Sequence, residues 1–310
     1  MSNSQRVAYG ETLVDLGKNN NDIVVLEADL GKSTMGSLFE TAYPNRFFEM
    51  GIAESNMASA AAGLSLTGKI PFMASFAVFS TGRCYDQIRT NICIPALNVK
   101  ICGSSAGMSD FGDGSTHQSI DDIALMRVLP NMQVFSPVDD AETRKIVRYM
   151  VENQGPMYIR INRNDLPALS NSYEEFIPGK VYTLRDGTDA VIFATGVMVG
   201  LSLEAAEHLS KRGISVKVVN VPTIKPLCSD DVAAAAKDIP FVITAEEHSV
   251  FGGLGDAICA VLGSTEPKKY RRVGVNDKFG TSAENYEVLL EEYGLSVAAV
   301  ESAVSELLGR

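Results

Sequence analysis

Short apolar runs alternate with helix-like segments in two successive series, and this alternation restricts the fold more than any other feature of the chain. The first run ends in acidic residues and a glycine, as a buried parallel strand does. Strand-like runs lie at residues 22–30, 69–79, 96–104, 131–140 and 155–163 in the first series and at 190–196, 214–222, 240–247 and 270–275 in the second. Because strands that alternate with helices form parallel sheets, we predict an α/β fold with two parallel-sheet domains.

The pattern loosens between the two series. Residues 164–189 contain two prolines and scattered acids, without a strand or helix period. We therefore predict a first domain at residues 1–170, a linker at 171–186 and a second domain at 187–310.

Charge and composition exclude several classes of partner. The chain has 27 Lys and Arg against 38 Asp and Glu, a net charge of −11, and no basic run. This argues against a nucleic-acid partner and against an anionic membrane surface. We also expect no leader and no membrane span, because no long apolar run is present. The five cysteines are never spaced CxxC and the three histidines are dispersed, which argues against a zinc site and favours a reduced, cytoplasmic setting.

One acidic residue stands alone in the stretch from Phe48 to Phe79. Glu54 is the only charged residue between Glu49 and Lys69, and its helical neighbours three and four positions away carry no charge. We predict that Glu54 is buried at the start of a helix, without a cation. Burial of a carboxyl group without a cation raises its pKa, and such groups are typical of active sites. The alternative is that Glu54 only stabilises the N-terminus of its own helix.

Two glycine motifs match known signatures but lack part of their context. Residues 63–69 have the spacing of a phosphate-binding loop, but Ile70 stands where Ser or Thr is needed, and the glycines end a helix instead of leading into one. Residues 252–255 resemble a dinucleotide fingerprint, but no acid follows on a strand at the right distance. We interpret the second motif as the start of a closely packed helix.

A third motif, at residues 103–107, fits the nucleophile pattern GxSxG. Ser105 would be the nucleophile, and His248 is available as the base. The motif needs a helix directly after the serine, whereas the loop sequence MSDFGDGS follows. A serine hydrolase therefore stays a minor hypothesis.

Several longer stretches together resemble the second half of a transketolase. They are residues 45–64, 75–89, 111–139, 156–163 and 245–258. The resemblance covers nearly the whole chain and implies a pyrimidine-binding domain followed by a transketolase C-terminal domain, as in families where the enzyme is split into two subunits. It also implies thiamine diphosphate as the cofactor and transfer of a two-carbon ketol unit from a ketose to an aldose.

The magnesium motif of thiamine diphosphate enzymes is incomplete in this chain. The family motif is GDG followed, at a longer interval than here, by an asparagine that helps to bind Mg²⁺ through oxygen. Gly112, Asp113 and Gly114 are present, but the next asparagine, Asn131, follows Gly114 by only 17 positions. We expect no metal ligand from this chain. The resemblance implies that a partner subunit with the pyrophosphate-binding domain holds the diphosphate and Mg²⁺, in an α2β2 assembly.

The resemblance assigns cofactor contacts to four residues. Glu54 matches the glutamate that faces N1′ of the aminopyrimidine, where a carboxylic acid favours the tautomer that removes the thiazolium C2 proton. Phe76 and Phe79 match aromatics that pack on the pyrimidine ring, although Gly82 replaces a third aromatic, and plain core is their alternative role. Asp29 matches an acid near the cofactor, at the carboxyl end of a strand where α/β ligands gather.

The resemblance also implies the substrate contacts. Asp113 and His117 match residues that hydrogen-bond the sugar hydroxyls, and His117 is also a predicted catalytic residue. The positions that match residues gripping the substrate phosphate are Arg6, Ser33 and Arg163. For the arginines, a surface or interface ion pair is the alternative. Ser105 replaces a phosphate-contacting histidine, so the acceptor is either a modified sugar phosphate or a sulfonated sugar under this hypothesis.

Two other functions stay open at this point. The beta subunit of a 2-oxo-acid dehydrogenase has the same two-domain layout and the same glutamate, although the DGSTHQ loop and the strand with Arg163 favour sugar chemistry. The second alternative function is that of a binding or scaffolding subunit without catalytic activity. The joint presence of Glu54, Asp113 and His117 argues against it.

Overall fold

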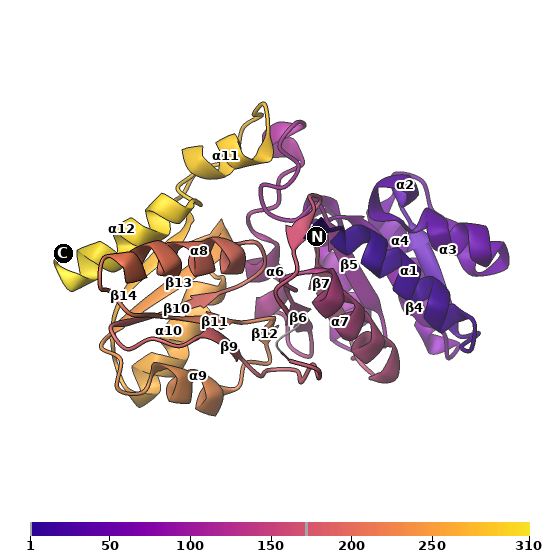
Figure 1. Cartoon of the computed structure of the whole chain (residues 1–310). Helices are drawn as coiled ribbons and strands as arrows, with labels where there is room; N and C mark the ends of the chain where they lie inside the picture. The colour runs from indigo at the N-terminus through magenta and orange to yellow at the C-terminus, as the bar shows by residue number, and fades with distance from the viewer. Residues whose placement is uncertain (1, 171–172) are drawn as a thin grey trace.

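The computed structural model describes residues 2–170 and 173–310, which form two α/β units side by side (Figure 1). Residues 171–172, the start of the predicted linker, lie outside the described residues. The prediction of two mostly parallel-sheet α/β domains is confirmed. Strands such as β2 (Ile23–Glu27) and β10 (Ala190–Ala194) have every residue buried, as expected for parallel sheets that helices cover on both faces.

The first unit contains a seven-stranded sheet in the order β12-β6-β7-β5-β4-β2-β3. β12 runs antiparallel to β6, and the other neighbours are parallel. Its other strands are β3 (Phe47–Glu49), β4 (Ile70–Phe76), β5 (Lys100–Ser104), β6 (Gln133–Phe135), β7 (Met157–Arg160) and β12 (Thr223–Lys225). The flanking helices are α1 (Gln5–Gly17), α2 (Gly31–Thr34), α3 (Ser37–Ala42), α4 (Glu54–Leu66), α5 (Tyr85–Gln87), α6 (Asp122–Val128) and α7 (Asp140–Glu152).

The second unit contains a five-stranded sheet in the order β14-β13-β10-β11-β9. Only the edge strand β9 is antiparallel to its neighbour among the described strands of this sheet. The remaining strands are β9 (Tyr182–Arg185), β11 (Val216–Asn220), β13 (Phe241–Ser249) and β14 (Lys269–Val275), and the helices are α8 (Met198–Lys211), α9 (Ser229–Ala236), α10 (Leu254–Thr265), α11 (Tyr286–Glu292) and α12 (Val297–Leu308). A short antiparallel pair, β1 (Ser2–Asn3) with β8 (Leu166–Pro167), lies outside both sheets.

Two short strands, β12 and β9, lie where the chain passes between the two units. β12 follows β11 of the second sheet along the chain but pairs with β6 of the first sheet. β9 lies within the predicted linker and forms the edge of the second sheet. The predicted domain boundaries stay a prediction, because β12, within the predicted second domain, belongs to the sheet of the first unit.

The segment between β4 and β5 contains no continuous α-helix over residues 79–93. It contains instead the π-helical turn η2 (Phe79–Arg83), the short helix α5 and a second π-helical turn, η3 (Ile88–Cys93). The hydroxyl of Thr81 donates to the carbonyl of Ala77, and that of Thr90 donates to the carbonyl of Asp86. Such hydroxyl bonds compete with the helical ladder and bend helices. Phe79 and Arg83 therefore begin and end a π-helical turn that follows closely after the carboxyl end of β4.

A buried polar network joins the two units behind that edge. Arg160 of β7 donates to the carboxylate of Asp122 through Nε at 2.9 Å and to the carbonyl oxygen of Glu247 at 3.1 Å. The Glu247 carboxylate accepts from the backbone N–H of Met108 and from the hydroxyl of Tyr286, each at 2.7 Å. Every polar atom of this network has a fixed partner, so it holds the two units in one arrangement.

No helix in the described part of the chain is long and apolar enough to cross a membrane.

Candidate active site

Glu54 begins helix α4 and is only 4% exposed. The predicted burial and helix start are confirmed. The prediction that no cation accompanies Glu54 is wrong, because Nη1 of Arg83 donates to its Oε1 at 2.9 Å. Arg83 lies 29 residues further along the chain, so the spacing of charges along one helix could not reveal it. The side chain of Arg83 is 49% exposed, whereas its partner is buried.

Three aromatic rings lie beside this ion pair. Phe76 ends strand β4, and Phe79 follows it at a centroid distance of 6.1 Å with the rings nearly parallel. The ring of His117 meets both phenyl rings edge-on, at 6.1 Å and 5.2 Å. The guanidinium of Arg83 lies over the Phe79 ring, 4.1 Å from its centroid. Phe76 is almost fully buried, but Phe79 and His117 are only partly buried, so this group borders the surface.

A second charged group, around Arg163 and Asp110, lies beside the aromatic rings. Nη1 of Arg163 donates to the carboxylate of Asp110 at 2.7 Å, and its guanidinium lies 6.0 Å from the Phe76 centroid. Burial raises the pKa of Asp110, the Arg163 charge opposes this, and the neighbouring Asp113 raises it further. Asp113 and Arg163 are therefore brought together through Asp110. Sequence reasoning missed Asp110, and its place in the Gly, Ser and Asp-rich loop was the only signal.

Arg6 joins the same group from helix α1. Its Nη1 donates to the backbone oxygen of Ser33 at 2.8 Å, and its buried Nε has no partner among the described residues. Burial and the nearby positive charge of Arg163 lower the pKa of Arg6. Two guanidinium groups close enough to perturb each other are an arrangement that an anion would stabilise.

Two predicted site residues, Asp29 and Ser105, make no described contact with the group around Glu54 and His117. Asp29 follows β2 at the same sheet edge with φ of 61°, and its backbone N–H donates to Glu49. No contact joins its carboxylate to Glu54 or to the phenyl rings among the described interactions. Ser105 is fully buried, and its hydroxyl has no hydrogen-bond partner among the described residues. No described hydrogen bond joins it to His117 or to either arginine.

The serine hydrolase hypothesis finds no support in the geometry. No described hydrogen bond joins the hydroxyl of Ser105 to His248. The ring of His248 instead accepts from the backbone N–H of Ala124 through Nε2, and its Nδ1 lies 2.7 Å from the carbonyl oxygen of Ser249. The candidate base is thus occupied by backbone partners.

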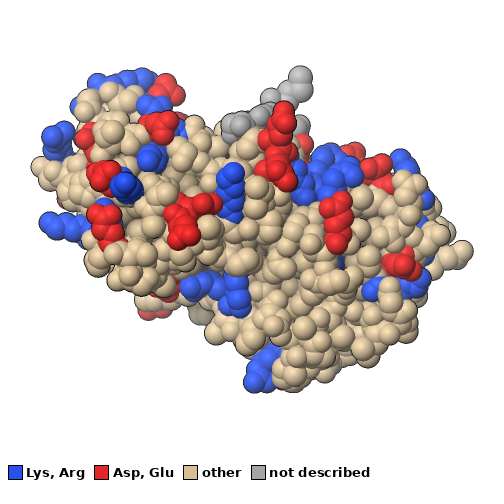
Figure 2. Space-filling model, turned by 90° about the horizontal axis from the view of Figure 1, so that it is seen from below, with Lys and Arg blue, Asp and Glu red and all other residues tan. Residues whose placement is uncertain are grey.

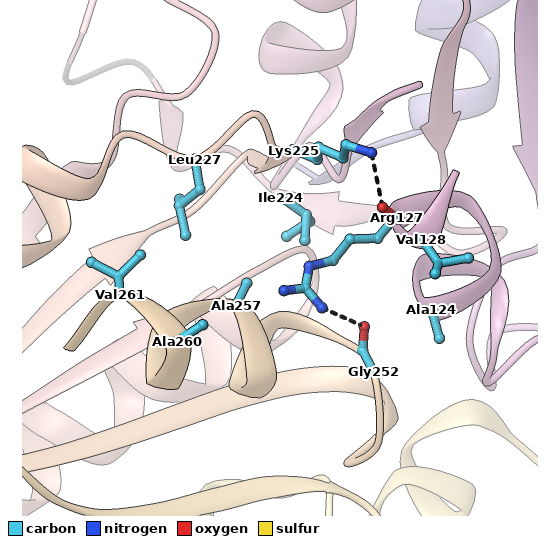
Figure 3. A pocket seen from close by; sticks show the side chains of 10 residues that line it. All are labelled: Ala124, Arg127, Val128, Ile224, Lys225, Leu227, Gly252, Ala257, Ala260 and Val261. Atoms are coloured by element: carbon cyan, nitrogen blue, oxygen red, sulfur yellow. Dashed lines mark hydrogen bonds between the residues drawn. The ribbon is translucent and has the colours of Figure 1, made fainter. Parts of the chain in front are cut away.

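A groove of about 610 Å³ lies elsewhere, between α6, β12 and α10 (Figure 3). Arg127 crosses it and donates to the carbonyl of Gly252 at 3.2 Å. Lys225 donates to the carbonyl of Arg127 at 3.0 Å. The other lining residues are apolar, and none belongs to the group around Glu54. With its cations bound to carbonyls, the groove offers no free catalytic group among its lining residues.

Two family models match the chain almost end to end. Residues 2–168 match the pyrimidine binding domain of transketolase, and residues 179–300 match the transketolase C-terminal domain. The chain belongs to the transketolase family. The pyrimidine-binding match implies thiamine diphosphate as the cofactor, and we conclude that the chain is a subunit of a split transketolase.

Relatives of similar length support this conclusion. A transketolase C-terminal section of Methanocaldococcus jannaschii is 43% identical over 97% of this chain and 95% of that protein. A 6-deoxy-6-sulfo-D-fructose transketolase subunit of Clostridium sp. is 39% identical over 98% of this chain and 94% of that protein. A solved split-gene transketolase, described as an inactive beta4 tetramer, has a TM-score of 0.90 at 47% identity, covering 100% of this chain and 99% of that one. These matches favour a transketolase over the beta subunit of a 2-oxo-acid dehydrogenase.

The residues around Glu54 fit the pyrimidine half of thiamine diphosphate. A flat heteroaromatic ring needs an apolar face to pack on, and Phe76 and Phe79 supply nearly parallel rings. A ring nitrogen needs a hydrogen-bonding carboxyl group, and Glu54 is the buried carboxyl beside them. No group of three or more His, Cys, Asp and Glu side chains within the described ranges is arranged to hold a metal ion.

Proposed function

We propose that this chain supplies the pyrimidine side of a transketolase active site, at which a two-carbon ketol unit passes from a ketose to an aldose. One observation carries the proposal: a carboxyl group that is 4% exposed begins a helix, and its partner Arg83 lies over the ring of Phe79, which stacks on Phe76. Buried carboxyl groups with a single, half-exposed partner are suited to proton exchange.

Each residue of the group has a proposed task. Glu54 exchanges a proton with the pyrimidine nitrogen, and Phe79 and Phe76 hold the ring in place. Bound thiamine diphosphate supplies the electron sink for the carbon chemistry. His117 and Asp113, on the polar loop beside the rings, hydrogen-bond the hydroxyls of the sugar.

The proposed substrate has an anionic end. Burial and the charge of Arg163 lower the pKa of Arg6, although Asp165 and Asp110 oppose the shift. An anionic group of the substrate beside the two guanidinium groups would be stabilised by both. Since Ser105 is a buried neutral hydroxyl, no imidazolium assists at its position. We therefore keep a sulfonated or otherwise modified sugar as the proposed substrate, in line with the sulfo-fructose activity named for the Clostridium relative.

Steady-state kinetics on matched sugar phosphates and sugar sulfonates test the substrate class. We expect kcat/KM for a modified or sulfonated sugar to equal or exceed that for ordinary pentose and hexose phosphates. A strong preference for the ordinary phosphates would overturn this part of the proposal.

The proposed partner is a subunit with a pyrophosphate-binding domain, which would hold the diphosphate and Mg²⁺ in an α2β2 assembly. Seen from below, the lower part of the first unit is a broad face with few charged side chains, and most of the charges of that unit lie toward its upper edge (Figure 2). Large apolar side chains exposed on the first unit are Phe48, Ile52, Leu66, Ile94 and Val128. Such surfaces are typical of subunit interfaces. A cytoplasmic location also stays a prediction, supported by five free cysteines.

The Glu54→Ala variant tests the proposed function. With the partner subunit, thiamine diphosphate and Mg²⁺ present, we expect turnover to fall by about 10²–10⁴-fold or more, while circular dichroism and gel filtration show unchanged folding and assembly. Normal turnover in the variant would contradict the proposal.

A further inference from the structure

We propose that Arg83 is a positioning residue that keeps Glu54 ionised until the cofactor ring displaces it, so that cofactor binding takes up a proton from solvent. This inference rests on the proposed function, because it concerns the same carboxyl group and the same cofactor.

Arg83 makes the two contacts that an aminopyrimidine ring would need. Its Nη1 lies 2.9 Å from Oε1 of Glu54, and its guanidinium carbon lies 4.1 Å from the centroid of the Phe79 ring. Guanidinium is planar and stacks on aromatic faces much as a heteroaromatic ring does. Arg83 and a pyrimidine ring cannot both occupy the space between Glu54 and Phe79.

The two contacts favour different protonation states of Glu54. A guanidinium group is a cation that only donates hydrogen bonds, so its contact favours Glu54 as an accepting carboxylate. A ring nitrogen with a lone pair accepts, so Glu54 must donate as a carboxylic acid. Exchange of one for the other therefore adds one proton from solvent to the Glu54 carboxylate, and no other bond changes.

Arg83 is held in its position only by contacts at the edge of the site among the described interactions. Its side chain is 49% exposed, and it ends the π-helical turn η2, a type of turn that is frequent at functional sites. Its departure would leave Glu54 buried without a cation, and a carboxyl group in that setting becomes neutral. Removal of the cation thus favours the form that the ring nitrogen needs.

Cys84, whose pKa the charge of Glu54 raises, does not compete with Glu54 for the proton. Burial and the Glu54 charge raise the pKa of the Cys84 thiol to about 12, so this thiol stays neutral at working pH. His117 contacts the Phe79 ring edge-on, and no described hydrogen bond or ion pair joins it to Glu54. Arg83 is accordingly the only charged group paired with Glu54 among the described residues.

Calorimetric titration measures the proposed proton uptake. The assembled pair of subunits is titrated with thiamine diphosphate at saturating Mg²⁺ in buffers of different ionisation enthalpy, which gives the number of protons bound per cofactor. We expect the parent to take up about one proton more than Arg83→Met, with Arg83→Lys close to the parent, because the cation determines the state of Glu54. The diphosphate contributes equally in all variants and cancels in the difference.

Affinity supplies a second readout. Arg83→Met should bind the cofactor on the order of 10-fold more tightly, because no charged hydrogen bond has to be broken first. Equal proton uptake and equal or weaker affinity in Arg83→Met would overturn the inference. If Arg83→Met fails to assemble, a structure of the loaded parent pair decides: the inference requires Arg83 beyond hydrogen-bond distance of Glu54, and a retained contact contradicts it. Failure of the parent pair to bind thiamine diphosphate would instead contradict the proposed function.

Discussion

Glu54 in the first unit and Glu247 between the units are both 4% exposed, yet they differ in every partner. The carboxylate of Glu247 accepts from Met108, Tyr286 and Asn162, all of them buried. Glu54 has one partner, Arg83, whose side chain is half exposed.

The difference separates a carboxylate held in a structural network from the carboxylate that we propose to be functional. Three fixed donors and the nearby Arg160 leave Glu247 no geometry for a ligand. A single, half-exposed donor would let Glu54 exchange its partner without disturbing the buried core. Burial alone is therefore no signal of function, whereas burial with a removable partner is.

The largest effect on stability is expected from Arg160→Met in the network around Glu247. The variant leaves the carboxylate of Asp122 buried without its cation, so we expect a loss of about 3–5 kcal/mol in the free energy of unfolding. Arg148→Met removes an exposed pair with Asp15 at 3.0 Å and should cost at most about 1 kcal/mol. Urea unfolding measures both. Similar losses in the two variants would break the distinction between the two kinds of charge pair.

The pH dependence of stability is the next effect in size. Burial raises the pKa of Glu247 to about 7, although Arg160, Tyr286 and Met108 oppose the shift. Glu247 then binds a proton more tightly in the folded state than in the unfolded state. The stability that this proton contributes is complete below the unfolded pKa of about 4.5 and is lost as pH rises through about 7.

Thermal unfolding from pH 5 to pH 8 should therefore show falling stability, and Glu247→Gln should remove on the order of 1–3 kcal/mol of that fall. Burial also raises the pKa of Glu27 to about 8 and of Glu142 to about 7, so part of the fall should persist. Glu11→Gln, in an exposed pair, is the control. An unchanged slope in Glu247→Gln would show that this carboxyl group is ionised throughout.

The smallest effect is expected from Phe79→Leu. Loss of one ring face should weaken cofactor binding by about 0.5–1.5 kcal/mol, which is roughly 2- to 13-fold. Phe241→Leu, in the second sheet, should leave cofactor affinity unchanged. Fluorescence titration of the assembled pair measures both. Equal affinity in Phe79→Leu and the parent would assign this ring to the core, the alternative considered from the sequence.

The sequence predicted the fold well because buried strands and flanking helices leave strong periodic signals. It also predicted that Glu54 begins a helix and is buried, since no other charged residue lies near it along the chain. The partner of Glu54 could not be predicted, because the contact with Arg83 depends on a π-helical turn that side-chain hydroxyls help to form.

Other features could not be predicted from the sequence for a similar reason. Strand β12 leaves the second unit to join the first sheet, and a three-residue strand at a sheet edge has no period to detect. Asp110 was hidden among other polar loop residues. The burial of Ser105 depends on how its loop folds back on the sheet, which local sequence does not determine.

Exchange of the C2 proton of thiamine diphosphate with deuterium tests the central claim about Glu54 most directly. The measurement compares the assembled parent pair with Glu54→Gln, both saturated with cofactor and Mg²⁺. The account predicts that the exchange rate falls by about 10²-fold or more in the variant while the cofactor stays bound. An exchange rate equal to that of the parent would contradict it.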